Sequence, residues 1–199
     1  MQQFSARRAL LLCCASLLAL ASVRCDALSA CNLEMNEFET LAAGYSKLFG
    51  VTDIEAPELL TWRDEQRPLL LIDVRRPQEQ SVSHLPGAIL ARTHEDLGEL
   101  AVVQDFRKRY ANDSRARIVV YCAAGYRSGR SISKMSGATD ATPAVINLRG
   151  GIIAYANSGG PLVTPAGAAT RKVHGYNQKW SSYLKPPAQA VLEPPIPDA

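Results

Sequence analysis

Residues 118–128 read Ile-Val-Val-Tyr-Cys-Ala-Ala-Gly-Tyr-Arg-Ser, and their pattern is the strongest indication of the fold class. Its first four residues are a continuous apolar run, which is typical of a strand buried on both faces of a parallel sheet. Cys122 follows at once, then a short loop of small residues, and then a serine-rich helix predicted over 128–137. The stretch therefore predicts a Cys at the carboxyl end of a central strand, where open parallel sheets bind their ligands.

The neighbouring segments repeat this alternation of strand and helix. Short apolar runs predict strands over 69–72 and 145–148. Apolar residues at helical spacing predict helices from Pro57, over 97–110 and through Tyr155. Such an alternation indicates one α/β domain with a mainly parallel sheet. The patterned region has about 120 residues, which is enough for a single core.

The loop after the strand has the residues needed for an activated thiol. The following helix presents free N–H groups and the positive end of its dipole, and Arg127 adds a charge that favours the thiolate. The loop residues are small, so backbone amides can turn inward and bind an anion such as thiosulfate, or the outer sulfur of a persulfide. The stretch thus predicts Cys122 as the catalytic nucleophile. The predicted substrate-binding residues are Ala123, Ala124, Gly125, Tyr126, Arg127 and Ser128.

Four pieces of sequence, taken in order, resemble the rhodanese family. They are Leu-Ile-Asp-Val-Arg at 71–75, His-Leu-Pro-Gly-Ala at 84–88, the Cys-x-x-Gly-x-Arg-Ser loop, and Leu-Arg-Gly-Gly-Ile at 148–152. The resemblance covers residues 51–162 and implies an α/β fold with a five-stranded parallel sheet and helices on both faces. It also implies a ping-pong sulfurtransferase, in which Cys122 takes sulfane sulfur from a donor such as thiosulfate and passes it to cyanide or a thiol.

Two other functions use a thiol or a fold of this kind. A Cys-based phosphatase or arsenate reductase also needs a thiolate beside an anion cradle. Its Arg stands one position further from the Cys, in a wider loop that suits a tetrahedral oxyanion. Arg127 stands five positions after Cys122, which favours sulfur transfer. A non-catalytic rhodanese-like module that only binds a partner typically lacks the Cys, which this chain has.

Several residues around the loop also have structural explanations. Cys122 could be an inert buried thiol and Arg127 a solvated helix-start residue, but their fixed spacing favours catalysis and an anion-facing Arg. We expect Asp73 and Arg75 to tie a strand end to its neighbouring loop. Arg149, which precedes two glycines, either lines the mouth of the pocket or faces water.

The two ends of the chain differ from this domain in composition. Residues 1–21 combine a basic N-terminus, a short apolar run and a small-x-small cleavage pattern at their end. This order predicts a secretory signal peptide. Cys31, in a lipobox-like Leu-Ser-Ala-Cys stretch, offers an alternative end at residue 30. We expect residues 22–50 to lead into the domain, residues 51–162 to form it, and residues 163–199 to be a C-terminal extension, Pro-rich from 186. Export predicts a periplasmic protein, with a lipid-anchored form at a membrane surface or an organelle lumen as alternatives.

Charge and residue spacing limit the partners. The net charge of +3 falls to +1 without residues 1–21, so no overall charge attracts nucleic acid. The three His are scattered and far from any Cys pair, so we expect no metal site, and no cofactor. We expect a monomer that meets a small anionic sulfur donor and a cyanide or thiol acceptor, and that contacts a membrane only if Cys31 is lipidated. Cys25 and Cys31 could pair in an oxidising compartment.

Overall fold

A computed structural model of the chain describes residues 37–92, 95–136 and 142–193. The expected signal peptide, its alternative end at residue 30, and Cys25 and Cys31 lie outside the described residues. The chain from Glu39 onward forms one compact unit.

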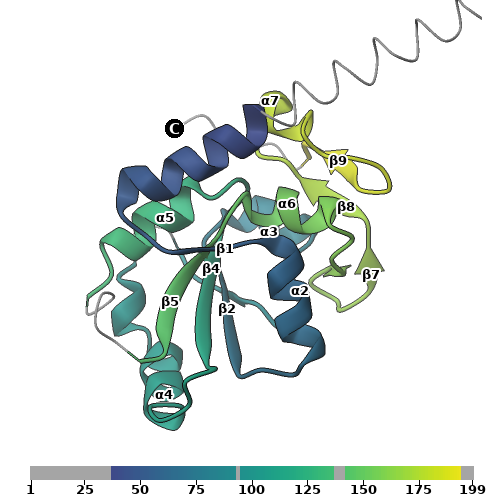
Figure 1. Ribbon diagram of the computed structural model, residues 1–199. Coiled ribbons are helices and arrows are strands. Elements are labelled where there is room, and N and C mark those ends of the chain that lie inside the picture. The colour runs from purple at the N-terminus through teal and green to yellow at the C-terminus, as the bar shows by residue number, and fades with distance from the viewer. Residues whose placement is uncertain (1–36, 93–94, 137–141, 194–199) are drawn as a thin grey trace, which may run out of the picture. The chain divides into compact units, whose positions relative to one another are not determined.

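A five-stranded parallel sheet lies at the centre of the unit (Figure 1), in the order β1-β5-β4-β2-β3. All four strand pairs are parallel. The strands are β1 (Asp53–Ile54), β2 (Leu69–Asp73), β3 (Ile89–Leu90), β4 (Arg117–Tyr121) and β5 (Ala144–Leu148). The three apolar runs of the sequence are thus the three long central strands, and the expected α/β fold is confirmed.

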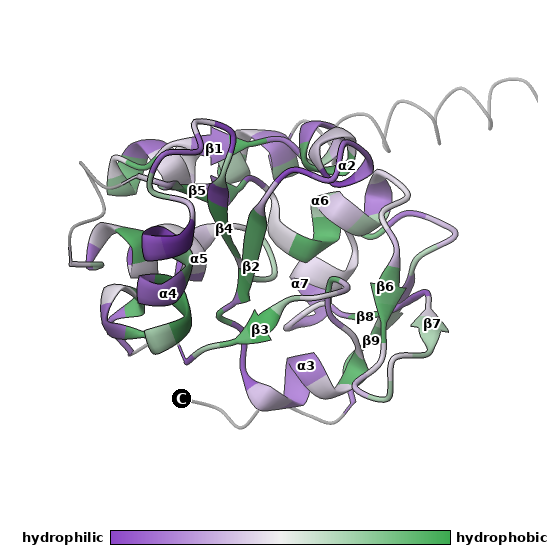
Figure 2. Cartoon of the chain, turned by 90° about the horizontal axis from the view of Figure 1, so that it is seen from below, coloured by the Kyte–Doolittle hydropathy of each residue, from purple (hydrophilic) through white to green (hydrophobic). Residues whose placement is uncertain are grey.

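Side chains of the central strands alternate between two hydrophobic cores, as the two-residue period of a strand requires. Leu71, Val119 and Tyr121 belong to one core, whereas Ile118, Val120 and Cys122 belong to the other. Figure 2 shows β2 and β3 in green, as hydrophobic strands, beside an α4 that is largely purple. Cys122 therefore continues the alternation of β4 and lies on one defined face of the sheet.

Helices cover both faces of the sheet. Leu59 of α2 (Ala56–Asp64) and Ile152 of α6 (Gly151–Asn157) enter the first core, and Pro57 occupies the first turn of α2 as expected. Val103 of α4 (Ala101–Arg109) and Ile132 of α5 (Tyr126–Ser133) enter the second core. The helix expected over 97–110 begins as a 3-10 turn, η1 (Leu97–Glu99). The serine-rich helix starts two residues earlier than expected, because Gly125 turns the chain with a φ of +100°.

Residues beyond 162 are part of the compact unit rather than a plain extension. They add β6 (Leu162–Val163), β7 (Ala169–Thr170), β8 (Lys172–His174), α7 (Gln178–Ser181) and β9 (Gln189–Val191). β6 pairs with β7, and β8 pairs with β9, which lies in the Pro-rich stretch from 186. Val173 is fully buried in the core beneath α2 and α6. The expected boundary at residue 162 therefore cuts through packed structure.

The expected lead-in over 22–50 also contains packed structure. Residues 37–49 are helical, and Ala42 and Ser46 are buried. A short α3 (Pro77–Val82) completes the set of elements. Within the part of the chain that the structure describes, no helix has the length and apolar character to span a bilayer.

Candidate active site

Cys122 directly follows β4 and is the first residue of the loop that leads into α5. The residue is only 2% exposed, and Ala123 and Ala124 beside it are also buried. The Gly125 N–H donates to the Cys122 Sγ across 3.2 Å. A backbone amide of the loop therefore turns toward the sulfur, as the small loop residues predict.

The first turn of α6 holds the other side of the loop. The Ile152 N–H donates to the Cys122 carbonyl at 2.9 Å, and the Ile153 N–H donates to the Ala123 carbonyl at 3.3 Å. A Cβ on Gly151 would lie 2.2 Å from the Cys122 carbonyl oxygen, so only Gly allows this approach. The backbone of α6 thus satisfies the Cys122 and Ala123 carbonyls, while the Gly125 N–H on the other side of the loop is directed to the sulfur.

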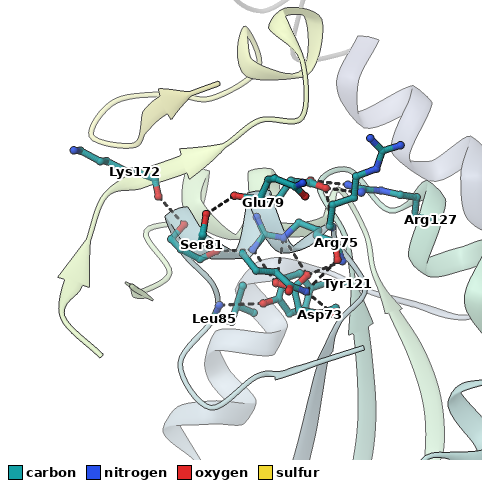
Figure 3. A network of polar contacts seen from close by, with 12 residues as sticks. Asp73, Arg75, Glu79, Ser81, Leu85, Tyr121, Arg127 and Lys172 are labelled. Carbon is teal, nitrogen blue, oxygen red and sulfur yellow. Dashed lines mark hydrogen bonds and ion pairs between the residues drawn. The ribbon is translucent and has the colours of Figure 1, made fainter. Parts of the chain in front are cut away.

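Arg127 is part of an ion pair instead of an open anion site (Figure 3). Its Nη1 and Nη2 donate to the two carboxylate oxygens of Glu79 at 2.5 and 2.7 Å. Its guanidinium also stacks on the Tyr176 ring, 4.9 Å from the ring centroid. Burial opposes the charge of Arg127, but the Glu79 hydrogen bonds and the nearby charge of Cys122 raise its pKa above the ordinary value. Arg127 is thus paired with a carboxylate that the sequence did not predict, and its anion-facing role stays a prediction.

Glu79 is that partner, and its side chain is fully buried in α3. The Arg76 N–H donates to Glu79 Oε2 at 2.9 Å. Burial alone would raise the pKa of the Glu79 carboxyl, but the hydrogen bonds and charge of Arg127 outweigh burial and lower it. The sequence does carry a signal for Glu79, since an acid in the third position of a helix that begins with Pro is a capping pattern.

Asp73 and Arg75 form a second, fully buried ion pair beside the first. Arg75 Nη2 donates to Asp73 Oδ2 at 2.8 Å and to the Ser83 carbonyl at 2.6 Å. The Tyr121 hydroxyl accepts the Leu85 N–H at 3.1 Å. These bonds tie the ends of β2 and β4 to the segment after α3, which is the structural role expected of Asp73 and Arg75.

Ser128, predicted to bind substrate, lies behind the loop and is held by hydrogen bonds within the fold. It is fully buried, and its hydroxyl donates to Asn147 Oδ1 at 2.6 Å. Asn147 Nδ2 donates to Asp53 Oδ1 at 2.9 Å, and the Ser46 hydroxyl donates to the same oxygen at 2.5 Å. This buried chain of hydrogen bonds joins α5, β5, β1 and the helix over 37–49.

Tyr126 is the most exposed residue of the loop stretch, at 42%. Its ring meets Tyr45 and Phe49 edge-on, with centroids 5.2 Å apart in both pairs.

Arg149, for which the sequence left two interpretations open, forms an ion pair with Glu55. Among the described residues, no group of three or more His, Cys, Asp or Glu could hold a metal ion.

Comparisons with known proteins found one matching family model and several similar proteins. A family model described as a rhodanese-like domain matches residues 55–158. A sulfurtransferase from Allochromatium vinosum is 29% identical over 117 residues, which are 59% of this chain and 99% of that protein. A thiosulfate:glutathione sulfurtransferase from Saccharomyces cerevisiae is 35% identical over 68 residues, covering 32% of this chain and 48% of that protein. A solved thiosulfate sulfurtransferase from Pseudomonas aeruginosa aligns with a TM-score of 0.48 and 23% identity, over 73% of this chain and 26% of that one.

Proposed function

Because the chain belongs to the rhodanese-like domain family, we propose that it is a sulfurtransferase in which Cys122 carries the transferred sulfur. One observation carries this proposal: the Cys122 Sγ receives the Gly125 N–H at 3.2 Å, in a loop next to a helix start and a partly buried Arg. A sulfur held by a backbone amide is suited to bear negative charge, both as a thiolate and as a persulfide. The relatives that are named sulfurtransferases support the same reaction class.

In the first half-reaction, the Cys122 thiolate attacks the outer sulfur of thiosulfate. A bond forms between the Cys122 Sγ and that sulfur, the S–S bond of thiosulfate breaks, and sulfite leaves with the bonding electron pair. The enzyme then carries a Cys122 persulfide anion. The total charge is unchanged by the step, so no proton donor is needed.

In the second half-reaction, a nucleophile attacks the outer sulfur of the persulfide. Cyanide takes this sulfur to form thiocyanate, or a thiolate takes it to form a new persulfide. The S–S bond to Cys122 breaks, and Cys122 leaves as the thiolate that began the cycle. The inward amide and the positive end of α5 stabilise the negative sulfur in both halves.

The ion pair of Arg127 argues against the phosphatase alternative. A phosphatase loop uses its Arg fork to bind the tetrahedral oxyanion, but here Glu79 occupies both terminal nitrogens of Arg127. Arg127 keeps a positive charge near the sulfur without offering a free fork. The single outer sulfur of a persulfide needs no such fork, so the ion pair is compatible with sulfur transfer.

Substitution of Cys122 tests the proposal directly. Cys122→Ser keeps a small polar side chain but cannot form a persulfide, so we expect sulfur uptake from thiosulfate and thiocyanate formation to disappear. Mass spectrometry of the wild-type chain after thiosulfate treatment should find one added sulfur on the peptide that contains Cys122. Far-ultraviolet circular dichroism controls for folding. A folded Ser variant that retains most of the activity would refute the mechanism.

A further inference from the structure

The C-terminal end of α6 and the segment after it surround a cavity of about 550 Å³, which we call the extension pocket. Its lining residues fall within 156–162, 169–172 and 187–189, and come from α6, β6, β7 and the starts of β8 and β9. Figures 1 and 2 both show β7, β8 and β9 on the side of the unit away from α4. Apart from Ala156, the lining lies outside residues 55–158, the region of the family match. The extension pocket is thus separate from the Cys122 loop.

The floor of the extension pocket is apolar. Ala156 and Leu162 belong to the core beneath α2 and α6. Further apolar surface comes from Pro161, Ala169, Pro187 and Ala188. A Cβ on Gly159 would meet nothing within 4 Å, so open space borders the backbone there. The Gly159 N–H already donates to the Ala156 carbonyl at 3.0 Å. An apolar group can therefore lie on this floor without separating these peptide groups from their hydrogen-bond partners.

The polar side of the extension pocket carries two cations. Arg171 and Lys172 are both exposed, and no Asp or Glu is among the described residues of the lining. Neither cation forms an ion pair with another residue that the structure describes, whereas Arg75 and Arg127 do. Figure 3 shows the Lys172 side chain directed away from those two ion pairs. The pocket therefore presents two positive charges to a ligand.

Hydrogen bonds fix the backbone beneath the two cations. The Lys172 N–H donates to Thr170 Oγ1 at 3.1 Å, and the Lys172 carbonyl accepts the Ser83 hydroxyl at 2.6 Å. The Gln189 N–H donates to the Arg171 carbonyl at 2.8 Å. The two charges thus stand on backbone that is already ordered, which lowers the entropy cost of binding a ligand.

We propose that the extension pocket is a second binding site, which takes a small organic anion made of a carboxylate and an apolar group. Charge complementarity decides the occupant, because Arg171 offers its planar fork to the carboxylate and Lys172 adds a second charge. The apolar group lies on the floor of the pocket. The volume of the pocket is within the range of roughly 300–1,000 Å³ that small-molecule sites have. The proposal goes beyond the sulfurtransferase function and does not depend on it.

Titrations of the isotope-labelled full chain, followed by two-dimensional nuclear magnetic resonance, test the proposal. The probes are phenylacetate, acetate as the carboxylate alone, and phenylacetamide as the uncharged isostere. We expect phenylacetate to shift the backbone amide signals of Gly160, Thr170 and Gln189, with a Kd at least about tenfold below those of the other two probes. The Gly125 amide reports on the Cys122 loop in the same spectra.

Substitutions at the extension pocket should weaken the binding of phenylacetate. The double variant Arg171→Ala/Lys172→Ala removes both charges but keeps the backbone bonds of the strand, and we expect its Kd to rise about tenfold or more. Lys108→Ala/Arg109→Ala is the matched control, because it removes two exposed charges from α4, on the other face of the sheet. Its Kd should stay within about twofold of the wild-type value. Ala169→Phe fills the pocket from an exposed position and should also raise the Kd about tenfold or more. Thermal melts identify any variant that fails to fold, and Ala169→Phe decides if the double variant does.

The contrary outcomes are distinct. Equal affinity for phenylacetate and phenylacetamide would mean that the cations do not bind the ligand, and equal affinity for acetate would mean that the floor does not, so either result overturns the proposal. An unchanged Kd in a folded pocket variant overturns it as well. So does a probe that shifts the Gly125 amide and leaves the pocket amides unchanged, because that probe binds the Cys122 loop. The titration needs no sulfur transfer, so a failure of the sulfurtransferase proposal and a failure of this one are distinguishable.

Discussion

At the scale of single residues, the site depends on two pairs of opposite charges, one fully buried and one largely buried. Glu79 and Arg127 form one pair, and Asp73 and Arg75 form the other. A buried pair adds little net stability, but removal of one partner is costly, because the other charge stays buried. We therefore expect the position of the Arg127 guanidinium to depend on Glu79.

Glu79→Gln tests this dependence. The substitution keeps the shape of the side chain but leaves the Arg127 guanidinium with a neutral partner, so we expect the free energy of unfolding to fall by about 3 kcal/mol near neutral pH. Glu58→Gln, at an exposed position of α2, should change it by less than about 0.5 kcal/mol. Urea denaturation followed by circular dichroism measures both.

The difference between wild type and Glu79→Gln should shrink in acid. The pKa of Glu79 is lowered in the folded chain from an ordinary value of 4.5, so the unfolded chain binds the proton more readily. The stabilisation from the charged carboxylate is therefore full above pH 4.5 and is lost as the pH falls through the folded-state pKa. A difference that stayed constant over this range would mean that the ionised carboxylate is not what stabilises the fold.

At the scale of elements, the meeting of β4, α5 and α6 makes the loop. Gly125 begins α5 with a φ of +100°, and Gly151 begins α6 with a φ of +55°. Residues other than Gly are strained in this region of backbone conformation. The close approach of Gly151 to the Cys122 carbonyl adds a steric demand at the second position.

Gly151→Ala and Gly159→Ala separate backbone strain from steric clash. Gly159 also has a positive φ, +78°, but a Cβ there meets nothing within 4 Å. We expect Gly159→Ala to cost about 1 kcal/mol from strain alone. Gly151→Ala should cost several times more and should abolish sulfur uptake, because the new Cβ displaces the loop. Equal melting temperatures for the two variants would contradict the close approach of α6 to the loop.

The same elements show how far the sequence predicts this structure. β2, β4 and β5 each have a run of apolar residues, and Cys122 and Gly125 lie in one local motif, so the sequence predicts them well. β1 and β3 have two residues each, which is too short for any period. Glu79, Asn147 and Tyr45 were missed for another reason, since they reach the site through tertiary contacts that no local pattern records.

At the scale of the whole molecule, the segments that flank the family match complete the core and the site. The Ser83 hydroxyl donates to the Lys172 carbonyl at 2.6 Å, and the His84 N–H donates to the Val163 carbonyl at 2.9 Å. Val173 is fully buried. The part of the chain after residue 162 therefore stabilises the segment that carries Glu79.

A chain truncated after residue 162 tests this contribution. The truncation exposes the core beneath α2 and α6 and removes Trp180, so we expect a loss of at least about 3 kcal/mol in the free energy of unfolding. Val173→Ala in the full chain should lose about 1–2 kcal/mol, since it removes two methyl groups from the same core. A truncated chain that melts at the wild-type temperature would show that the domain ends at residue 162, as the sequence predicts.

The hydrogen-bond chain behind the loop also has a consequence for the order of folding. Ser46 and Asn147 are 101 positions apart, and β1, at the edge of the described sheet, pairs with β5. Contacts of such long sequence separation form late, because closing a long loop costs entropy before any contact repays it. We therefore expect the hydrogen bonds behind the loop to form among the last steps of folding, and Cys122 to lack its loop environment until then.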